Sequence, residues 1–179
     1  MTDIAPHGLH HVTAIASDPQ RNVDFYTRVL GLRLVKQTVN FDATDTYHLY
    51  YGDETGRPSS LLTFFPWRGV PAGRLGTGLT TATAFSIPPE SLGWWQQRLK
   101  ELDVEADRPG SRDSEEVLSF RDPDGMVIDL VASPGDTRSG WEREIRGYRV
   151  DLPTLHATYP ALRWTSFADW ADQTMGASS

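Results

Sequence analysis

One stretch of this chain occurs twice, and the repeat limits the possible folds more than any other feature. Residues 8–15 (Gly-Leu-His-His-Val-Thr-Ala-Ile) align without a gap with residues 78–85 (Gly-Leu-Thr-Thr-Ala-Thr-Ala-Phe), 70 residues later. The first copy holds β-branched residues and has no helical period, which is typical of a strand. A repeat at this spacing predicts two copies of one supersecondary unit that together bury a shared surface.

The residues after each copy predict the same order of elements, β-α-β-β-β. Asp18-Pro19 marks a helix start after the first copy, and Gly31 ends that helix. Pro88-Pro89 starts the helix of the second copy. Six later runs are expected to form strands: 32–41, 46–51, 59–65, 104–108, 115–121 and 126–132. Asp122-Pro123-Asp124-Gly125 predicts a tight turn between the last two runs.

The chain is therefore expected to be an α+β protein made of two tandem modules. The first module is expected over residues 1–66 and the second over 78–132, with a Gly- and Pro-rich linker at 67–77. Residues 133–179 are expected to hold a linker and a tail. Within that tail, the capping pattern at Ser166–Asp169 predicts a short helix.

Composition excludes several classes of function. The formal net charge of −7 and the lack of a Lys/Arg stripe argue against a nucleic-acid groove. The absence of cysteine excludes disulfides and thiolate metal sites, so any metal must be bound by His and carboxylate ligands. No signal-peptide core or membrane-length apolar run occurs in the sequence, so we expect a cytoplasmic protein without a membrane partner.

The two adjacent histidines of the repeat are the first candidates for chemistry. A neutral imidazole in a cavity is a common transition-metal ligand and a good general base. Successive side chains of a strand point to opposite faces, so His10 and His11 are not expected to share one pocket.

The organisation resembles the vicinal oxygen chelate superfamily, which includes glyoxalase I, bleomycin-resistance proteins, fosfomycin-resistance enzymes and extradiol ring-cleaving dioxygenases. The closer likeness is to the hydroquinone-type ring-cleaving dioxygenases. Four blocks carry it: GLHHVTAI at 8–15, GLRLVKQTVNF at 31–41, TYHLYYGD at 46–53 and TFFPW at 63–67. Such dioxygenases usually have four modules, whereas this chain has two and, at Ile145–Tyr148, what looks like the start of a third.

The resemblance implies an open, U-shaped mixed sheet around a cavity, with the helices outside. In the dioxygenases Fe(II) binds there to two His and one carboxylate. The resemblance assigns His11 as the ligand of the first strand, and it gives His10 and Thr13 catalytic positions beside the substrate. Because alternation separates His10 from the other two, its role requires a local twist or a neighbouring module.

Only part of that ligand set occurs at the corresponding positions. Thr81 occupies the position of the second imidazole, while Asp129 occupies that of the carboxylate, equivalent to about Thr63 in the first module. His48 could be a weak third ligand or a hydrogen-bonded sheet histidine. A homodimer could bring His11 of one chain near Asp129 of the other. Alternatively, a second polypeptide with two further modules could supply the missing ligands.

Two functions are compatible with these residues. One is Fe(II)-dependent, extradiol-type cleavage of a hydroxylated aromatic, in which His10 moves a proton; Mn, Zn or Ni could replace the iron. The other is a metal-free, dimeric binding protein of the bleomycin-resistance type, whose cavity holds a small planar ligand. Four aromatic side chains are the candidates for contacting that ligand or substrate: Tyr47, Tyr50, Phe64 and Trp67.

Overall fold

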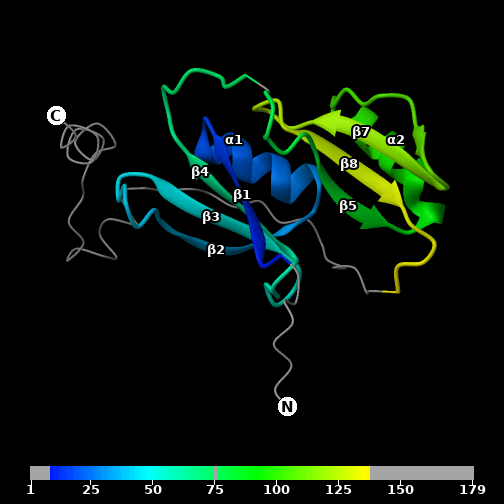
Figure 1. Cartoon of the computed structure of the whole chain (residues 1–179), viewed down its shortest axis with the longest axis horizontal. Helices are drawn as coiled ribbons and strands as arrows, with labels where there is room; N and C mark the ends of the chain where they lie inside the picture. Colours follow the sequence, from blue (N-terminus) through cyan, green and yellow to red (C-terminus); the bar gives the residue numbers. More distant parts are fainter. Residues whose placement is uncertain (1–8, 75, 138–179) are drawn as a thin grey trace, which may run out of the picture. The chain divides into compact units, whose positions relative to one another are not determined.

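The computed structural model describes residues 9–74 and 76–137. They form two four-stranded mixed sheets, each with its own helix, in two compact units (Figure 1). Along the chain, the boundary between the units falls between Gly69 and Val70. The predicted tandem β-α-β-β-β modules are therefore confirmed. The helix predicted in the tail and the start of a third module lie outside the described residues.

The first sheet has the strand order β1-β4-β3-β2. Its strands are β1 (His11–Ala16), β2 (Arg33–Val39), β3 (Tyr47–Gly52) and β4 (Leu61–Pro66). β1 runs parallel to β4, and the other neighbours are antiparallel. The connection from β1 contains α1 (Pro19–Asp24) and one π-helical turn, η1 (Phe25–Val29). The Asp18 side chain caps α1 by accepting a 2.8 Å hydrogen bond from the Arg21 N–H, and Gly31 follows η1 with a φ of 69°.

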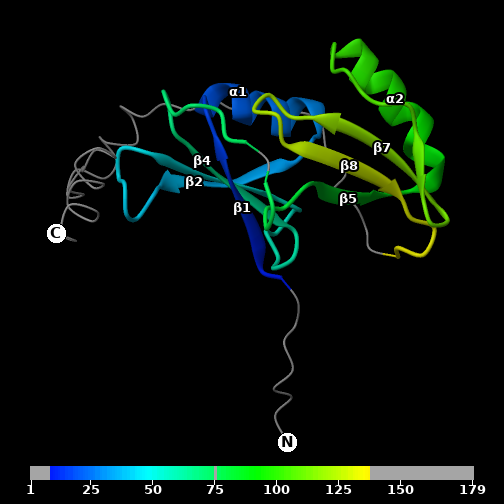
Figure 2. The same ribbon diagram turned by 45° about the horizontal axis from the view of Figure 1, so that its top comes forward.

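One face of this sheet packs against the helical segment, as Figure 2 shows. Alternate residues of β3 and β4 supply that face, including Tyr51 and Phe64, neither of which is exposed. The ring centroid of Tyr26 lies 5.1 Å from that of Tyr51 and 4.7 Å from that of Phe64. The opposite face carries the partly exposed residues of the same strands. It is called the open face below.

The second sheet repeats this order as β5-β8-β7-β6. Its strands are β5 (Thr83–Ile87), β6 (Gly110–Arg112), β7 (Glu115–Arg121) and β8 (Val127–Ala132). A 3₁₀ turn, η2 (Pro89–Ser91), leads into α2 (Leu92–Glu101), which buries Leu92 and Leu99. The prediction of a strand at 104–108 is wrong. In this segment a single residue, Ala106, makes an isolated β-bridge, to Phe120. Ladder pairing begins after Pro109, whose nitrogen has no hydrogen to donate.

The strand registers show which residues of the two modules correspond. Thr13 lies opposite Thr63 in the first sheet, and Ala84 lies opposite Asp129 in the second. Each parallel pair ends in an equivalent backbone hydrogen bond, from the Trp67 N–H to the Ala16 carbonyl and from the Ser133 N–H to the Ile87 carbonyl. Asp129 thus occupies the place of Thr63, as expected, but the first strands correspond with an offset of 71 residues rather than 70. The counterpart of His11 is therefore Ala82, and the assignment to Thr81 is wrong by one residue. A gapless alignment misses this shift, which reverses the face of every side chain.

Among the described residues, no helix is both long and apolar enough to cross a membrane.

Candidate functional site

The open face of the first sheet gathers the polar and aromatic side chains that carry candidate chemistry. Side chains alternate between the two faces of a strand, so every second residue of each strand lies here. Among them are His11, Thr13 and Ile15 of β1, Thr63 and Phe65 of β4, His48 and Tyr50 of β3, and Lys36 of β2. A β-bulge between Leu34 and Lys36 shifts the register of β2, so that Lys36 pairs with Tyr50.

His10 and His11 contact each other directly. Their Nδ1 atoms are 2.9 Å apart, and the rings meet edge to face with centroids 5.1 Å apart. His10 precedes β1, so strand alternation does not hold its ring on the opposite side. The chain there is fixed by Ser59, whose N–H donates to the His10 carbonyl (2.8 Å) and whose hydroxyl donates to the Leu9 carbonyl (2.6 Å). One imidazole must donate to the other, which couples their tautomers.

Four side chains from three strands form a continuous hydrogen-bonded chain across the open face. The Tyr50 hydroxyl lies 2.9 Å from His48 Nδ1, and His48 Nε2 lies 3.2 Å from the Thr63 hydroxyl. The Thr63 hydroxyl lies 2.8 Å from that of Thr13. Both ring nitrogens of His48 therefore have partners within the protein, and a metal at either nitrogen would have to replace one of them.

His48 also lies within a row of aromatic rings. Its ring centroid is 4.1 Å from that of Tyr50 and 4.1 Å from that of Phe65. The Phe65 ring continues the row by stacking on Trp67, with centroids 6.0 Å apart. Lys36 Nζ lies 5.4 Å from the centre of the Tyr50 ring, within the range of a cation–π interaction. The open face thus offers flat apolar surface beside its polar groups.

The surroundings of His48 keep its imidazole neutral. Burial is the main cause that lowers its pKa, and the nearby charges of His11 and Lys36 lower it further, to about 4. Burial also raises the pKa of the Tyr50 phenol above its usual value. Both groups of this pair are therefore uncharged near neutral pH.

The predicted ligand-contacting residues divide between the two faces of the sheet. Tyr50 and Trp67 belong to the aromatic row. Tyr47 is 5% exposed and Phe64 0%, and both lie on the helix-covered side. Sequence reasoning did not single out Phe65, which lies in the row although it adjoins Phe64. The two-residue period of β4, counted from Thr63, is the signal that could have identified it.

Asp129 belongs to the second sheet, where the Ser119 hydroxyl donates a 2.6 Å hydrogen bond to its Oδ1. Within the described ranges, no three His, Asp or Glu side chains group closely enough to hold a metal ion. The described residues therefore do not supply a complete set of metal ligands.

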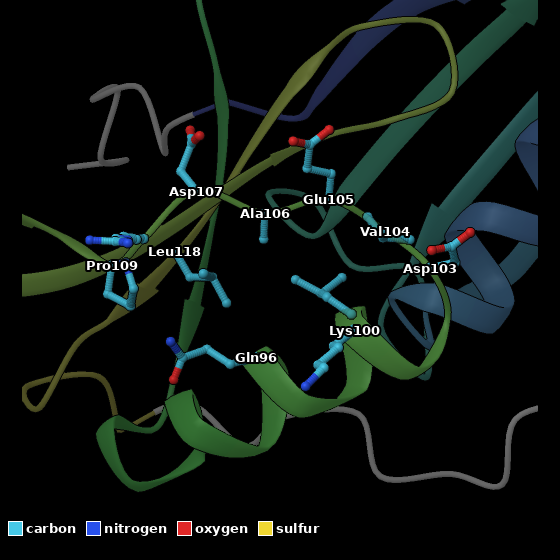
Figure 3. Close-up of a pocket in the computed structure, with 11 residues that line it drawn as sticks. Gln96, Lys100, Asp103, Val104, Glu105, Ala106, Asp107, Pro109 and Leu118 are labelled. Carbon is cyan, nitrogen blue, oxygen red and sulfur yellow. The ribbon is translucent and has the colours of Figure 1, made fainter.

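A cavity of about 700 Å³ lies in the second unit, between α2 and the segment 104–109 (Figure 3). Leu99 and Leu118 line it, and Lys100, Asp103 and Arg108 add charges of both signs. None of the candidate site residues lines this cavity, so it is separate from the open face of the first sheet.

Tandem β-α-β-β-β modules with histidines at the first strand define a glyoxalase-type protein. The chain belongs to the Glyoxalase/Bleomycin resistance protein/Dioxygenase superfamily, whose family model matches residues 8–130.

Several known proteins are similar to the chain. It is 43% identical over 134 residues to a Bacillus subtilis protein named "Putative ring-cleaving dioxygenase MhqO", covering 75% of this chain and 43% of that one. It is 37% identical over 154 residues to the chlorohydroquinone/hydroquinone 1,2-dioxygenase of Sphingobium indicum, covering 84% of this chain and 48% of that enzyme. The chain thus spans less than half the length of these two relatives.

Solved structures agree on the fold. A Bacillus subtilis crystal structure described as a putative dioxygenase matches with a TM-score of 0.67 and 46% identity, over 69% of this chain and 40% of that one. The fosfomycin resistance protein FosX of Listeria monocytogenes matches with a TM-score of 0.56 over 72% of this chain and 94% of its own. Its identity is only 18%, so that likeness concerns the fold alone.

Proposed function

We propose that this chain is part of a metal-dependent, extradiol-type dioxygenase that cleaves the ring of a small hydroxylated aromatic. The names of relatives at 37–43% identity support the reaction class, and one of them names hydroquinones as substrates. The observation that carries the proposal is the His10–His11 contact beside Thr13 on the open face.

His11 is the residue we propose as a metal ligand. If its Nδ1–H donates to Nδ1 of His10, the lone pair of His11 Nε2 is left for coordination. Metal-binding histidines generally donate a hydrogen bond from the N–H of their second ring nitrogen. This bond fixes the ring orientation and raises the basicity of the nitrogen that binds the metal. His10 then acts as the acceptor that orients His11, and its own proton lies on Nε2, which can donate a hydrogen bond to a substrate oxygen.

The remaining ligands must come from outside the first unit, because the described residues do not complete a set of three. We propose Asp129 of a second copy as one ligand, or a second polypeptide with two further modules as the source of the others. When bound, a divalent metal such as Fe(II), or Mn(II) in its place, would hold the substrate oxygens and O2 and stabilise negative charge. Sedimentation tests the first option: a chain that stays monomeric with metal present would contradict a site shared between copies.

Oxygen uptake with hydroquinone tests the proposed reaction. Protein loaded anaerobically with Fe(II) should consume one O2 per hydroquinone cleaved, and His11→Ala should lower the rate at least 100-fold. Tyr47→Phe, which changes a buried residue on the opposite face, should leave the rate within about twofold of wild type. Uptake by His11→Ala equal to that of wild type would contradict the proposal.

The aromatic row favours a second candidate, a metal-free protein that binds planar ligands. Stacking on Tyr50, Phe65 and Trp67 would hold a flat ring without any metal. Hydroquinone binding that is saturable, unaffected by chelators and unchanged in His11→Ala would favour this candidate over the dioxygenase.

A further inference from the structure

The hydrogen-bonded chain from Tyr50 to Thr13 has only two self-consistent arrangements of its protons. Thr63 connects the two halves of the chain and is completely buried, so its single hydroxyl proton needs an acceptor within the protein. That acceptor is either His48 Nε2, at 3.2 Å, or the Thr13 hydroxyl, at 2.8 Å. The group that does not accept must donate to Thr63.

In the first arrangement, Thr13 donates to Thr63 and Thr63 donates to His48 Nε2. The proton of the neutral His48 ring is then on Nδ1, which donates to the Tyr50 oxygen. Thr13 has used its proton, so it presents only lone pairs to the open face. It can accept a hydrogen bond from the hydroxyl of a ligand.

In the second arrangement, every one of these hydrogen bonds is reversed. Tyr50 donates to His48 Nδ1, His48 Nε2–H donates to Thr63, and Thr63 donates to Thr13. The Thr13 proton is now directed outward and can donate to an oxyanion. The tautomer of His48 thus decides whether Thr13 is an acceptor or a donor toward a ligand, although His48 need not touch the ligand.

We propose that the chain from Thr13 to Tyr50 is a proton relay, which removes the hydroxyl proton of an aromatic ligand bound on the open face. The ligand O–H passes its proton to Thr13, each member passes one proton onward, and Tyr50 releases one to water. One proton enters and one leaves, the ligand becomes an oxyanion, and no oxidant is needed. The half-buried position of Tyr50 gives the released proton access to solvent.

The electrostatics of the face fit a relay that transfers protons without storing charge. Burial, helped by His11 and Lys36, keeps the imidazole of His48 neutral, so it changes tautomer instead of becoming a cation. The tilted rings of Tyr50 and Phe65, each 4.1 Å from that of His48, keep the imidazole in place during the exchange. The inference rests on the proposed function only for the ligand class and requires neither metal nor ring cleavage.

The test uses 4-nitrophenol as the probe and the full chain in the presence of a chelator. The phenolate of this probe absorbs at longer wavelength than the phenol, so the pKa of the bound probe can be read directly. We expect binding to lower that pKa by about one unit, because the Thr13 donor stabilises the oxyanion. Thr13→Val should abolish the shift, and Tyr50→Phe should lose at least half of it from three hydrogen bonds away.

The matched control is Tyr51→Phe, one residue further along β3. The Tyr51 hydroxyl donates to Asn22 Oδ1 at 2.8 Å on the helix-covered side, so its loss should leave the probe pKa unchanged. Equal shifts in Tyr50→Phe and wild type, or no saturable binding of the probe, would overturn the relay.

Nitrogen NMR of ¹⁵N-histidine-labelled protein gives a readout that a purely structural role would not change. Saturation with the phenolate should move the His48 proton from Nδ1 toward Nε2, and no such change should occur in Thr13→Val. An unchanged tautomer in wild type would also overturn the proposal. If the shift in probe pKa and the change of His48 tautomer both occur in a protein that binds no metal, they would support the relay and contradict the proposed dioxygenase.

Discussion

His48 shows at the scale of one residue what sequence reasoning can and cannot determine. Its strand was predicted from the run 46–51, and its two possible roles, metal ligand or hydrogen-bonded sheet histidine, were left open. Its partners were not predicted, because Thr63 and Phe65 belong to a strand that is remote in sequence. The contact between His10 and His11 was equally hidden, since alternation fails for a residue that precedes the strand.

The lowered pKa of His48 makes folding stability depend on pH. The unfolded chain binds a proton at this imidazole below about pH 6.5, and the folded protein only below about 4. The unfolded state therefore binds more protons between these values, so stability falls as pH drops from 6.5 to 4. With allowance for partial exposure, the loss should be about 1–2 kcal/mol.

Urea unfolding at pH 7 and pH 4.5 measures this loss. Wild type should lose more stability between these two values than His48→Phe, which keeps an aromatic ring but cannot bind a proton. Equal losses in the two proteins would show that His48 is not the responsible group. Asp53 does not contribute in this range. Burial alone would raise its pKa, but hydrogen bonds from Arg57, Thr55 and Gly56 lower that pKa to about 2.

Adjacent phenylalanines of β4 should respond in opposite ways to truncation. Phe64 is fully buried against Tyr26 and Tyr51, so Phe64→Ala should cost about 3–5 kcal/mol of unfolding free energy. Phe65 lies partly exposed on the open face, and Phe65→Ala should cost about 1 kcal/mol while weakening the binding of planar ligands. Denaturant titration and 4-nitrophenol binding check both expectations; a larger stability loss in Phe65→Ala would contradict the assignment of the two faces.

At the scale of elements, sequence signals worked best where one residue fixes the backbone. The Asp18-Pro19 start and the Gly31 end bracket the first helical segment as predicted. Its π-helical turn, Phe25–Val29, carries no such signal. The strand expected at 104–108 did not form because a strand needs a continuous partner: segment 104–108 makes one isolated bridge to β7, and the continuous ladder with β7 begins only beyond Pro109.

Two glycines with equal space around them should respond in opposite ways to alanine. At Gly31 and Gly93 an added Cβ meets nothing within 4 Å, but only Gly31 has a positive φ, 69°. Gly31→Ala should therefore destabilise the protein by about 1 kcal/mol through backbone strain. Gly93→Ala, inside α2, should stabilise it by about 0.5 kcal/mol. Thermal unfolding compares the two variants, and a stable Gly31→Ala would contradict the assigned backbone conformation.

For the whole molecule, the internal repeat led to the tandem modules and hence to the superfamily. The strand registers then corrected the comparison between modules by one residue, because a gapless alignment takes no account of which face a side chain occupies. The complete site was beyond prediction for a physical reason. His11 and Asp129 lie on different sheets, and the described residues hold no group of three ligands.

Metal content is the most direct test of the central claim, that His11 binds a divalent metal of a dioxygenase-type site. Anaerobic loading with Fe(II), followed by desalting and elemental analysis, should leave stoichiometric iron in wild type and almost none in His11→Ala. His10→Ala should bind Fe(II) 10- to 100-fold more weakly than wild type, because this substitution removes only the partner that orients His11. Wild type without iron would contradict a site completed by a second copy of this chain, and His11→Ala with as much iron as wild type would contradict the claim that His11 is a ligand.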